Sequence, residues 1–258
     1  MPAVDPARLK REMESLRTAL PDLERFQREA LDLIQRYEDK TQRPARSLRT
    51  GRAFLTPLPL IKMLVRELGS YMEDNPVLYQ QAADTLWDSG NIELQYAAIQ
   101  MAASRSGPDV PTSAERWARG CEAFEVLDEL AGTGIGAWRD TSCDHFLSQV
   151  EIWLEKPWIR VQTFALLALK HAAAQQAFQD LPTVFRLVHP VDRFERRESR
   201  RALVQLVEEL ARRSPQEAAF FVIDELQEGG KHAKQLARKT LPIFPAPQQR
   251  LIQRTLSP

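Results

Sequence analysis

The side chains with the clearest capacity for chemistry lie between Trp117 and Ala131. In this stretch Trp117, Cys121, Phe124 and Asp128 follow one another at intervals of four, three and four residues. On one continuous helix, this spacing places the four side chains along a single stripe. A carboxylate at the end of an aromatic stripe can stabilise a cation. It can also lie at the solvent edge, cap a neighbouring helix or pair with an arginine, and the spacing leaves both interpretations open.

A helix that begins at about Thr112 is expected to position these residues. Thr112 or Ser113 would cap its start, and the G-T-G-I-G segment (132–136) would end it. These spaced glycines follow a predicted helix and not a strand, so the pattern does not indicate a phosphate-binding loop of the Rossmann or P-loop kind. The segment is therefore interpreted as a turn between helices.

The chain as a whole predicts an all-α protein. Good helix formers dominate, only 10 of the 258 residues are glycine, and strict alternation of apolar and polar residues is scarce. Helices joined by short turns indicate a HEAT-like helical-repeat solenoid (an α-α superhelix), with a compact helical bundle as the alternative. We expect one domain over 1–258, with an N-terminal helical cap over 1–40. Helices are expected at 5–39 (two), 57–73, 76–87, 92–103, 138–155, 157–175, 180–189, 194–213, 215–228, 230–242 and 246–256.

Several classes of protein are excluded by composition. Two cysteines do not make a disulfide framework, and the four histidines show no metal-ligand spacing, so neither a metal nor another cofactor is expected. The polar start does not indicate a signal peptide, and no apolar run is long enough to span a membrane. We expect a cytoplasmic, monomeric protein.

The formal net charge of zero conceals a strong polarity along the chain. Residues 40–66 contain seven basic residues and no acid, residues 67–158 contain five basic and sixteen acidic residues, and residues 229–258 contain six basic residues and no acid. Basic side chains can hold the phosphates of a nucleic acid, or they can form a solvated helix face. The candidates for phosphate binding are Arg49, Arg52, Arg160, Arg197, Arg200, Arg201, Lys231, Lys234 and Arg238.

Five segments, in this order, resemble the DNA alkylation repair family (AlkD type). The most specific are L-W-D-S-G-N-I-E-L-Q-Y-A-A-I (86–99), which is similar to the family's Trp, turn and E-x-Q-x-A-A-L segment, and F-E-V-L-D-E-L-A (124–131), which is similar to its W-D-x-V-D motif. Similar segments also occur at 52–68, 153–170 and 200–215. The resemblance covers about 45–245.

The resemblance implies a curved stack of HEAT-like repeats that grips duplex DNA. Members of this family excise purines alkylated at N3 or N7. Such bases are cationic and leave readily, so that the enzyme mainly needs a carboxylate near the sugar and aromatic walls around it. By resemblance, Asp128 would be the catalytic carboxylate and Phe124 the first wall. Trp117 or Trp158 could supply the second aromatic wall in place of the family's second Trp.

This sequence also departs from the family pattern. The family's second Trp falls at Gln205, and the Arg that follows it falls at Glu208. The family's other Arg falls beside Arg160. Because the departures concern the cleft and the matches concern packing, two hypotheses stay open. One is a DNA-binding protein, with or without alkylpurine glycosylase activity. The other is a non-catalytic scaffold that binds a protein partner.

Overall fold

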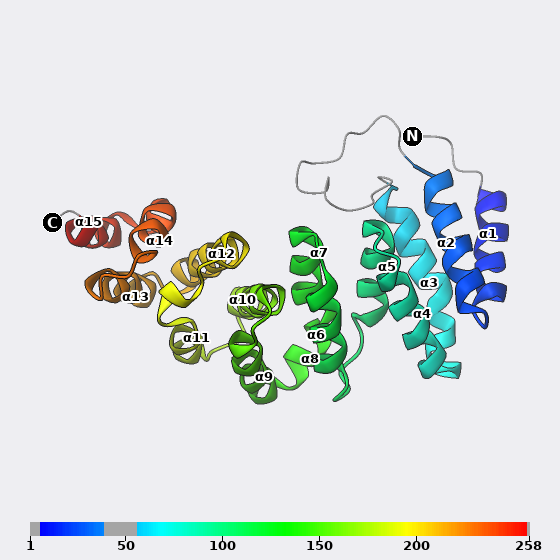
Figure 1. The fold of residues 1–258 in the computed structure, drawn as a ribbon, viewed down its shortest axis with the longest axis horizontal. Helices are drawn as coiled ribbons and strands as arrows, with labels where there is room; N and C mark the ends of the chain where they lie inside the picture. Colours follow the sequence, from blue (N-terminus) through cyan, green and yellow to red (C-terminus); the bar gives the residue numbers. More distant parts are fainter. Residues whose placement is uncertain (1–5, 39–55, 257–258) are drawn as a thin grey trace. The chain divides into compact units, whose positions relative to one another are not determined.

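The chain divides into two compact units, unit 1 (Met1–Trp138) and unit 2 (Arg139–Pro258). In the computed structural model, residues 6–38 and 56–256 are described, and every extended run of regular structure in them is helical (Figure 1). This confirms the prediction of an all-α, helical-repeat fold. The HEAT-like character of the repeats and the single domain over 1–258 stay predictions. No helix in these two ranges is both long and apolar enough to cross a membrane.

Unit 1 is built from helices that begin at the polar residues expected to cap them. Asp22, Asn75 and Asn91 each accept a hydrogen bond from the backbone N–H three residues later, which satisfies one of the free donors of a first helical turn. The helices are α1 (Pro6–Ala19), α2 (Leu23–Arg36), α3 (Leu58–Asp74), α4 (Pro76–Asp88), α5 (Ile92–Ala102), α6 (Val110–Gly120), α7 (Phe124–Glu129), a π-helical turn (Leu130–Gly134) and α8 (Gly136–Thr141), whose end lies in unit 2.

Alternate helices pack together in unit 1. Helix α1 contacts α3, α3 contacts α5 and α5 contacts α7, whereas α2 contacts α4. Between these rows lies an apolar core. In it the rings of Trp87 and Trp117 stack with their centroids 4.7 Å apart and their planes within 6° of parallel. The core therefore ties α4 to α6.

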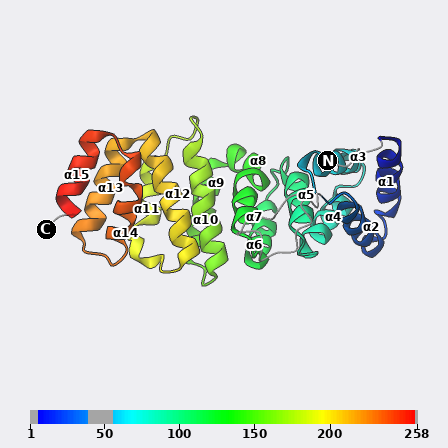
Figure 2. The same ribbon diagram turned by 90° about the horizontal axis from the view of Figure 1, so that it is seen from above.

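Unit 2 repeats the arrangement. Its helices are α9 (Cys143–Glu155), α10 (Ile159–Ala174), α11 (Leu181–Val188), α12 (Arg197–Arg213), α13 (Pro215–Gln227), α14 (Ala233–Thr240) and α15 (Ala246–Leu256). Helices α10, α12 and α14 lie side by side in one row, and α13 packs against α12, α14 and α15 (Figure 2). The helix α10 is apolar on nearly all sides, as a helix with neighbours on several faces must be.

Polar contacts fix the pairing of α10 with α12. The hydroxyl groups of Thr163 and Ser199 lie 3.0 Å apart in the buried interface. At the other end of α12, the Arg213 guanidinium donates hydrogen bonds to the carbonyls of Ala173 (2.9 Å), Gln175 and Phe178 (2.8 Å). The last carbonyls of a helix lack partners within it, so Arg213 closes the C-terminal end of α10.

Candidate functional site

The prediction of one continuous helix through Trp117 and Asp128 is wrong, because the helical conformation is interrupted between α6 and α7. Helix α6 ends at Gly120, and the backbone of Cys121 (φ −77°, ψ 123°) and Ala123 (φ −88°, ψ 124°) is extended. The buried Cys121 thiol donates a hydrogen bond to the Ala123 carbonyl, with Sγ and O 3.3 Å apart. This contact lies within the non-helical segment itself. Trp117 and Asp128 therefore belong to different helices, and only Phe124 and Asp128 share a face, one turn apart on α7.

Trp117 lies in the core of unit 1, where only 1% of its surface is exposed. Its indole Nε1 donates to Asp84 Oδ1 at 2.9 Å, and one face of the ring stacks on Trp87. A ring enclosed in this way offers no open face to a base, so we leave Trp117 out of the candidate site. Trp158, the second proposed replacement wall, caps α10 in unit 2. It is half-buried, with Lys156 Nζ 5.5 Å from the ring centroid.

Asp128 is half-buried on α7, and Phe124 on the same helix is 7% exposed. The residue that the sequence did not single out is Tyr96 of α5. Burial is the main cause that raises the pKa of Tyr96 to about 12, and the negative charges of Glu129, Glu125 and Asp128 raise it further. The phenol therefore stays protonated at neutral pH, within the electrostatic influence of three carboxylates of α7. The only signal in the sequence was that Tyr96 is the one aromatic residue of this helix.

Two acidic neighbours of Asp128, Glu125 and Glu129, lie on the same short helix α7. Glu129 accepts hydrogen bonds from Thr133 Oγ1 (2.6 Å) and Gln100 Nε2 (3.3 Å), which orient it toward α5 and the π-helical turn. Its charge and that of Glu125 act on the same Tyr96 hydroxyl as the charge of Asp128. The three acids form a region of negative potential in unit 1, suited to a cationic group.

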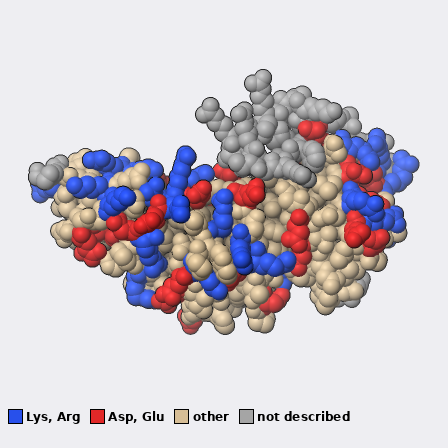
Figure 3. Space-filling model, viewed as in Figure 1, with Lys and Arg blue, Asp and Glu red and all other residues tan. Residues whose placement is uncertain are grey.

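Five of the predicted basic residues of unit 2 lie on α12 and α14, which contact each other, and Lys231 lies just before α14. Arg197 and Arg201 are exposed on α12, and Lys234 and Arg238 are exposed on α14. Figure 3 shows Lys and Arg side chains gathered over this end of unit 2, with acidic side chains among them. The helix α12 begins only at Arg197, three residues later than expected. Arg193 lies on a preceding 3-10 turn and donates to the Leu187 carbonyl.

Between α12 and α14 the surface forms a small depression of about 20 Å³. Its polar lining comes from Arg200, His232, Gln235 and Lys239, and the Arg200 guanidinium donates to His232 Nδ1 at 3.1 Å. Its floor is apolar. The structure thus brings together Arg200 and the 231–239 segment, which are more than 30 residues apart in the sequence.

The N-terminal end of α14 is already occupied by Asp192. This carboxylate accepts hydrogen bonds from the backbone N–H groups of Lys231 (2.6 Å) and His232 (2.8 Å). A Cβ atom on Gly230 would lie 2.7 Å from Asp192 Oδ1, so the close approach requires glycine at that position. The sequence had indicated basic residues with no acid nearby, which is wrong: the acid comes from the 3-10 turn before α12. Phosphate binding at α14 would therefore rely on the side chains of Lys231, Lys234 and Arg238.

Of the remaining predicted residues, the structure describes only Arg160. Arg160 is half-buried in the first turn of α10, and Arg49 and Arg52 lie outside the described residues. The positions that depart from the family pattern are both on α12. Gln205 is half-buried, and Glu208 lies 4.0 Å from Arg212 in an i,i+4 ion pair. Neither offers an aromatic face or a cation.

Comparison with known proteins adds one match. No curated protein and no solved structure matches this sequence. The profile of one protein family matches residues 17–242, which span both units from α1 to the 3-10 turn after α14. That span includes Tyr96, Phe124 and Asp128 in unit 1 and the basic residues of α12 and α14 in unit 2. The chain belongs to the DNA alkylation repair enzyme family.

Proposed function

We propose that this protein binds duplex DNA and excises purines that alkylation has made cationic. The proposal rests on family membership and on one observation in unit 1. Asp128 is half-buried on α7, its charge is one of those that act on the Tyr96 phenol of α5, and Phe124 lies on the same face of α7. A half-buried carboxylate stabilises positive charge more strongly than one in bulk water, because the local dielectric constant is lower.

Asp128 would act on the sugar and not on the base. As the N-glycosidic bond breaks, its electron pair leaves with the cationic base, which becomes neutral, and positive charge develops at C1′ and the ring oxygen. The Asp128 carboxylate stabilises this oxocarbenium-like charge, and a water oxygen then bonds to C1′ and releases a proton to solvent. Glu125 and Glu129 add to the same negative potential. The Phe124 and Tyr96 rings would supply apolar surface near the base.

The basic side chains of unit 2 would hold the DNA backbone. Arg197 and Arg201 on α12, and Lys234 and Arg238 on α14, are exposed, so that their side chains could contact phosphates. Phosphate contacts of this kind fix position without reading sequence, and they release counterions, so that binding weakens as salt rises.

The first test is a fluorescence-anisotropy titration of duplex DNA at low and moderate salt, with an intact site or a single abasic site. Salt-sensitive binding with preference for the abasic duplex would support the proposal. No binding at low salt would reject it.

The second test is excision from duplex DNA that contains 7-methylguanine, measured above spontaneous depurination. We expect Asp128→Asn to slow excision by about 10²-fold, the size of effect found when one preorganised electrostatic group is removed. The matched control is Glu122→Gln, an exposed acid just before α7 that should leave the rate unchanged. If both variants excise at the wild-type rate, Asp128 is not the catalytic carboxylate.

The alternative is a non-catalytic scaffold that binds a protein partner. It is favoured by two apolar side chains on the contacting helices α13 and α15: Phe220 is 57% exposed and Leu251 is 43% exposed. Gln205 and Glu208, which replace an aromatic ring and a cation of the family, also favour the non-catalytic scaffold. A scaffold predicts that DNA binds neither at low salt nor with preference for the abasic site, so the first titration separates the two functions.

A further inference from the structure

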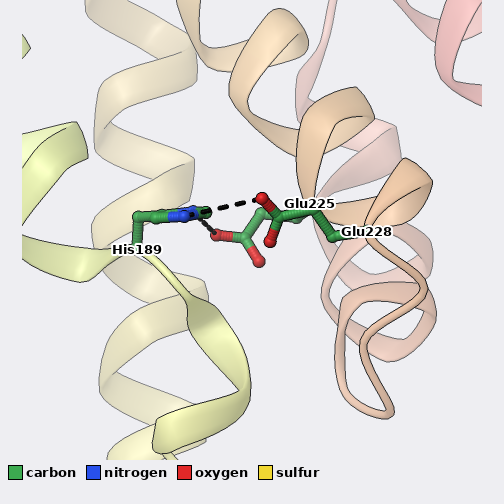
Figure 4. Close-up of side chains that lie close together, drawn as sticks. All are labelled: His189, Glu225 and Glu228. Carbon is green, nitrogen blue, oxygen red and sulfur yellow. Dashed lines mark hydrogen bonds and ion pairs between the residues drawn. The ribbon is translucent and has the colours of Figure 1, made fainter.

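Three potential metal ligands meet where α11 and α13 end in unit 2. His189 follows the last residue of α11, Glu225 lies in the last turn of α13, and Glu228 follows that helix directly. His189 Nδ1 lies 3.0 Å from Glu225 Oε1, and His189 Nε2 lies 3.6 Å from Glu228 Oε1 (Figure 4). One ligand atom from each of the three side chains can be chosen so that all lie within 4.8 Å of one another.

The central carboxylate is fixed by the backbone. Glu225 is 2% exposed, and the Val191 N–H donates to its Oε1 (3.2 Å) and its Oε2 (3.1 Å). A hydrogen bond of this kind orients a carboxylate and leaves lone pairs on both oxygens for a further partner. Glu225 is therefore held in place before any ion arrives.

No fixed cation balances the two acids. Within the described residues no Lys or Arg side chain pairs with Glu225, and the neighbouring charges that act on it are those of His189 and Glu228. With a neutral imidazole the three side chains carry a net charge of −2. A buried carboxylate beside a second carboxylate needs a positive partner, and an ion bound between them would supply it.

We propose that His189, Glu225 and Glu228 bind a divalent transition-metal ion of the Zn²⁺ class. An imidazole nitrogen with two carboxylate oxygens is a donor set that suits such an ion, whereas Mg²⁺ prefers oxygen ligands alone. Ligand atoms around a tetrahedral Zn²⁺ lie about 3.3 Å apart when the bonds are about 2.0 to 2.1 Å. One ligand atom from each of the three side chains already lies within 4.8 Å of the other two, so that small side-chain rotations would bring them to that separation. His189 and Glu228 are partly exposed and can adjust around the fixed Glu225.

The ion would join the end of α11 to the end of α13. Three protein ligands leave a coordination position for water on the exposed side, where His189 and Glu228 lie. Spacing in the sequence cannot reveal this site, because His189 and Glu225 are 36 residues apart and neither belongs to a short motif. The competing arrangement is a protonated His189 that bridges both carboxylates without any ion.

The test uses the full chain without an affinity tag, after treatment with a chelator. Isothermal titration with ZnCl₂ at pH 7.5 should give one ion per chain, and Zn²⁺ should raise the Tm, whereas MgCl₂ should do neither. His189→Gln and Glu228→Gln should each weaken Zn²⁺ binding at least tenfold. Asp224→Asn is the control, because Asp224 is an exposed acid next to Glu225 that is absent from the cluster, and binding should be unchanged.

Glu225 is not the first residue to change, since it also holds the Val191 N–H and its loss could unfold the turn. The proposal is overturned if wild-type protein takes up no Zn²⁺, or if it binds Zn²⁺ equally well in the His189 and Glu228 variants. A Tm that falls in His189→Gln while Zn²⁺ leaves the wild-type Tm unchanged would also overturn it, in favour of the histidine bridge.

Discussion

The Trp117 indole donates a hydrogen bond to the Asp84 carboxylate, with Nε1 and Oδ1 2.9 Å apart. The same carboxylate accepts from Gln80 Nε2 (3.0 Å) and pairs with Arg116, so α4 and α6 are joined by one polar cluster at the edge of the Trp87–Trp117 stack. Trp117 thus stabilises the fold of unit 1. Its substitution tests stability and does not test the proposed chemistry at Asp128.

We expect Trp117→Ala to lower the free energy of unfolding by about 3 to 5 kcal/mol, because it leaves a cavity in the core. Trp117→Phe keeps a ring but loses the Nε1 donor, and should cost about 1 to 2 kcal/mol. Urea denaturation measures both. A loss below about 1 kcal/mol for the alanine variant would contradict the buried position of this ring.

Arg213 should be more important for stability than its neighbour Arg212. Arg213→Ala removes the donors to three carbonyls at the end of α10, and a loss of about 2 kcal/mol is expected. Arg212→Ala removes only ion pairs with Glu208 and Glu209 on the surface, and should change stability by less than about 0.5 kcal/mol. Equal effects of the two substitutions on chemical denaturation would show that the carbonyl contacts do not stabilise α10.

Because of Asp192, the stability of unit 2 should depend on pH in the acidic range. Burial raises its pKa, but the hydrogen bonds from the His232 and Lys231 N–H groups outweigh burial, so that the pKa lies below its ordinary value. A carboxyl group with a folded-state pKa below its unfolded-state value stabilises the fold at pH values above about 3.9, and this contribution is lost as the pH falls through the folded-state pKa.

Asp192→Asn should accordingly cost about 1 kcal/mol at pH 7, and the difference from wild type should shrink below pH 4. Denaturation curves between pH 3 and pH 7 provide the comparison. A difference that grows toward low pH would have the wrong sign for this explanation.

DNA binding should depend on salt through α14. For each phosphate contact removed, the slope of log K against log salt should fall in magnitude by about 0.9. We therefore expect Lys234→Ala and Arg238→Ala to flatten the slope, and to weaken binding to all duplex sequences alike. Arg186→Ala is the control, because its guanidinium is already paired with Glu151 at 2.8 Å. An unchanged slope in the α14 variants would remove that helix from the DNA contact.

Local sequence signals predicted most of the helices. Polar caps such as Asn75 and Asn91, and prolines at the starts of α4 and α13, act within one helical turn, and the expected boundaries differ from the observed ones by a few residues. The break before α7 was missed. Gly120 at the end of α6 was a local signal for this break. The extended backbone of Cys121 goes together with the burial of its side chain, and burial cannot be determined from the local sequence.

The candidate site could be predicted only where its residues share one helix. Phe124 and Asp128 are one turn apart, so spacing related them correctly. Tyr96 reaches the acids of α7 because α5 packs against α7, and Asp192 reaches α14 across about 40 residues of chain. Contacts of this kind follow from how helices pack, and periodicity along one helix contains no information about them.

The position of Asp192 has a consequence for anions near α14. A phosphate that approached the Lys231 and His232 N–H groups would have to displace a carboxylate tethered to the same unit, and a tethered group competes at an effective concentration of millimolar or more. Inorganic phosphate or sulfate in a buffer should therefore inhibit DNA binding only by screening charge, to the same degree as chloride at equal ionic strength.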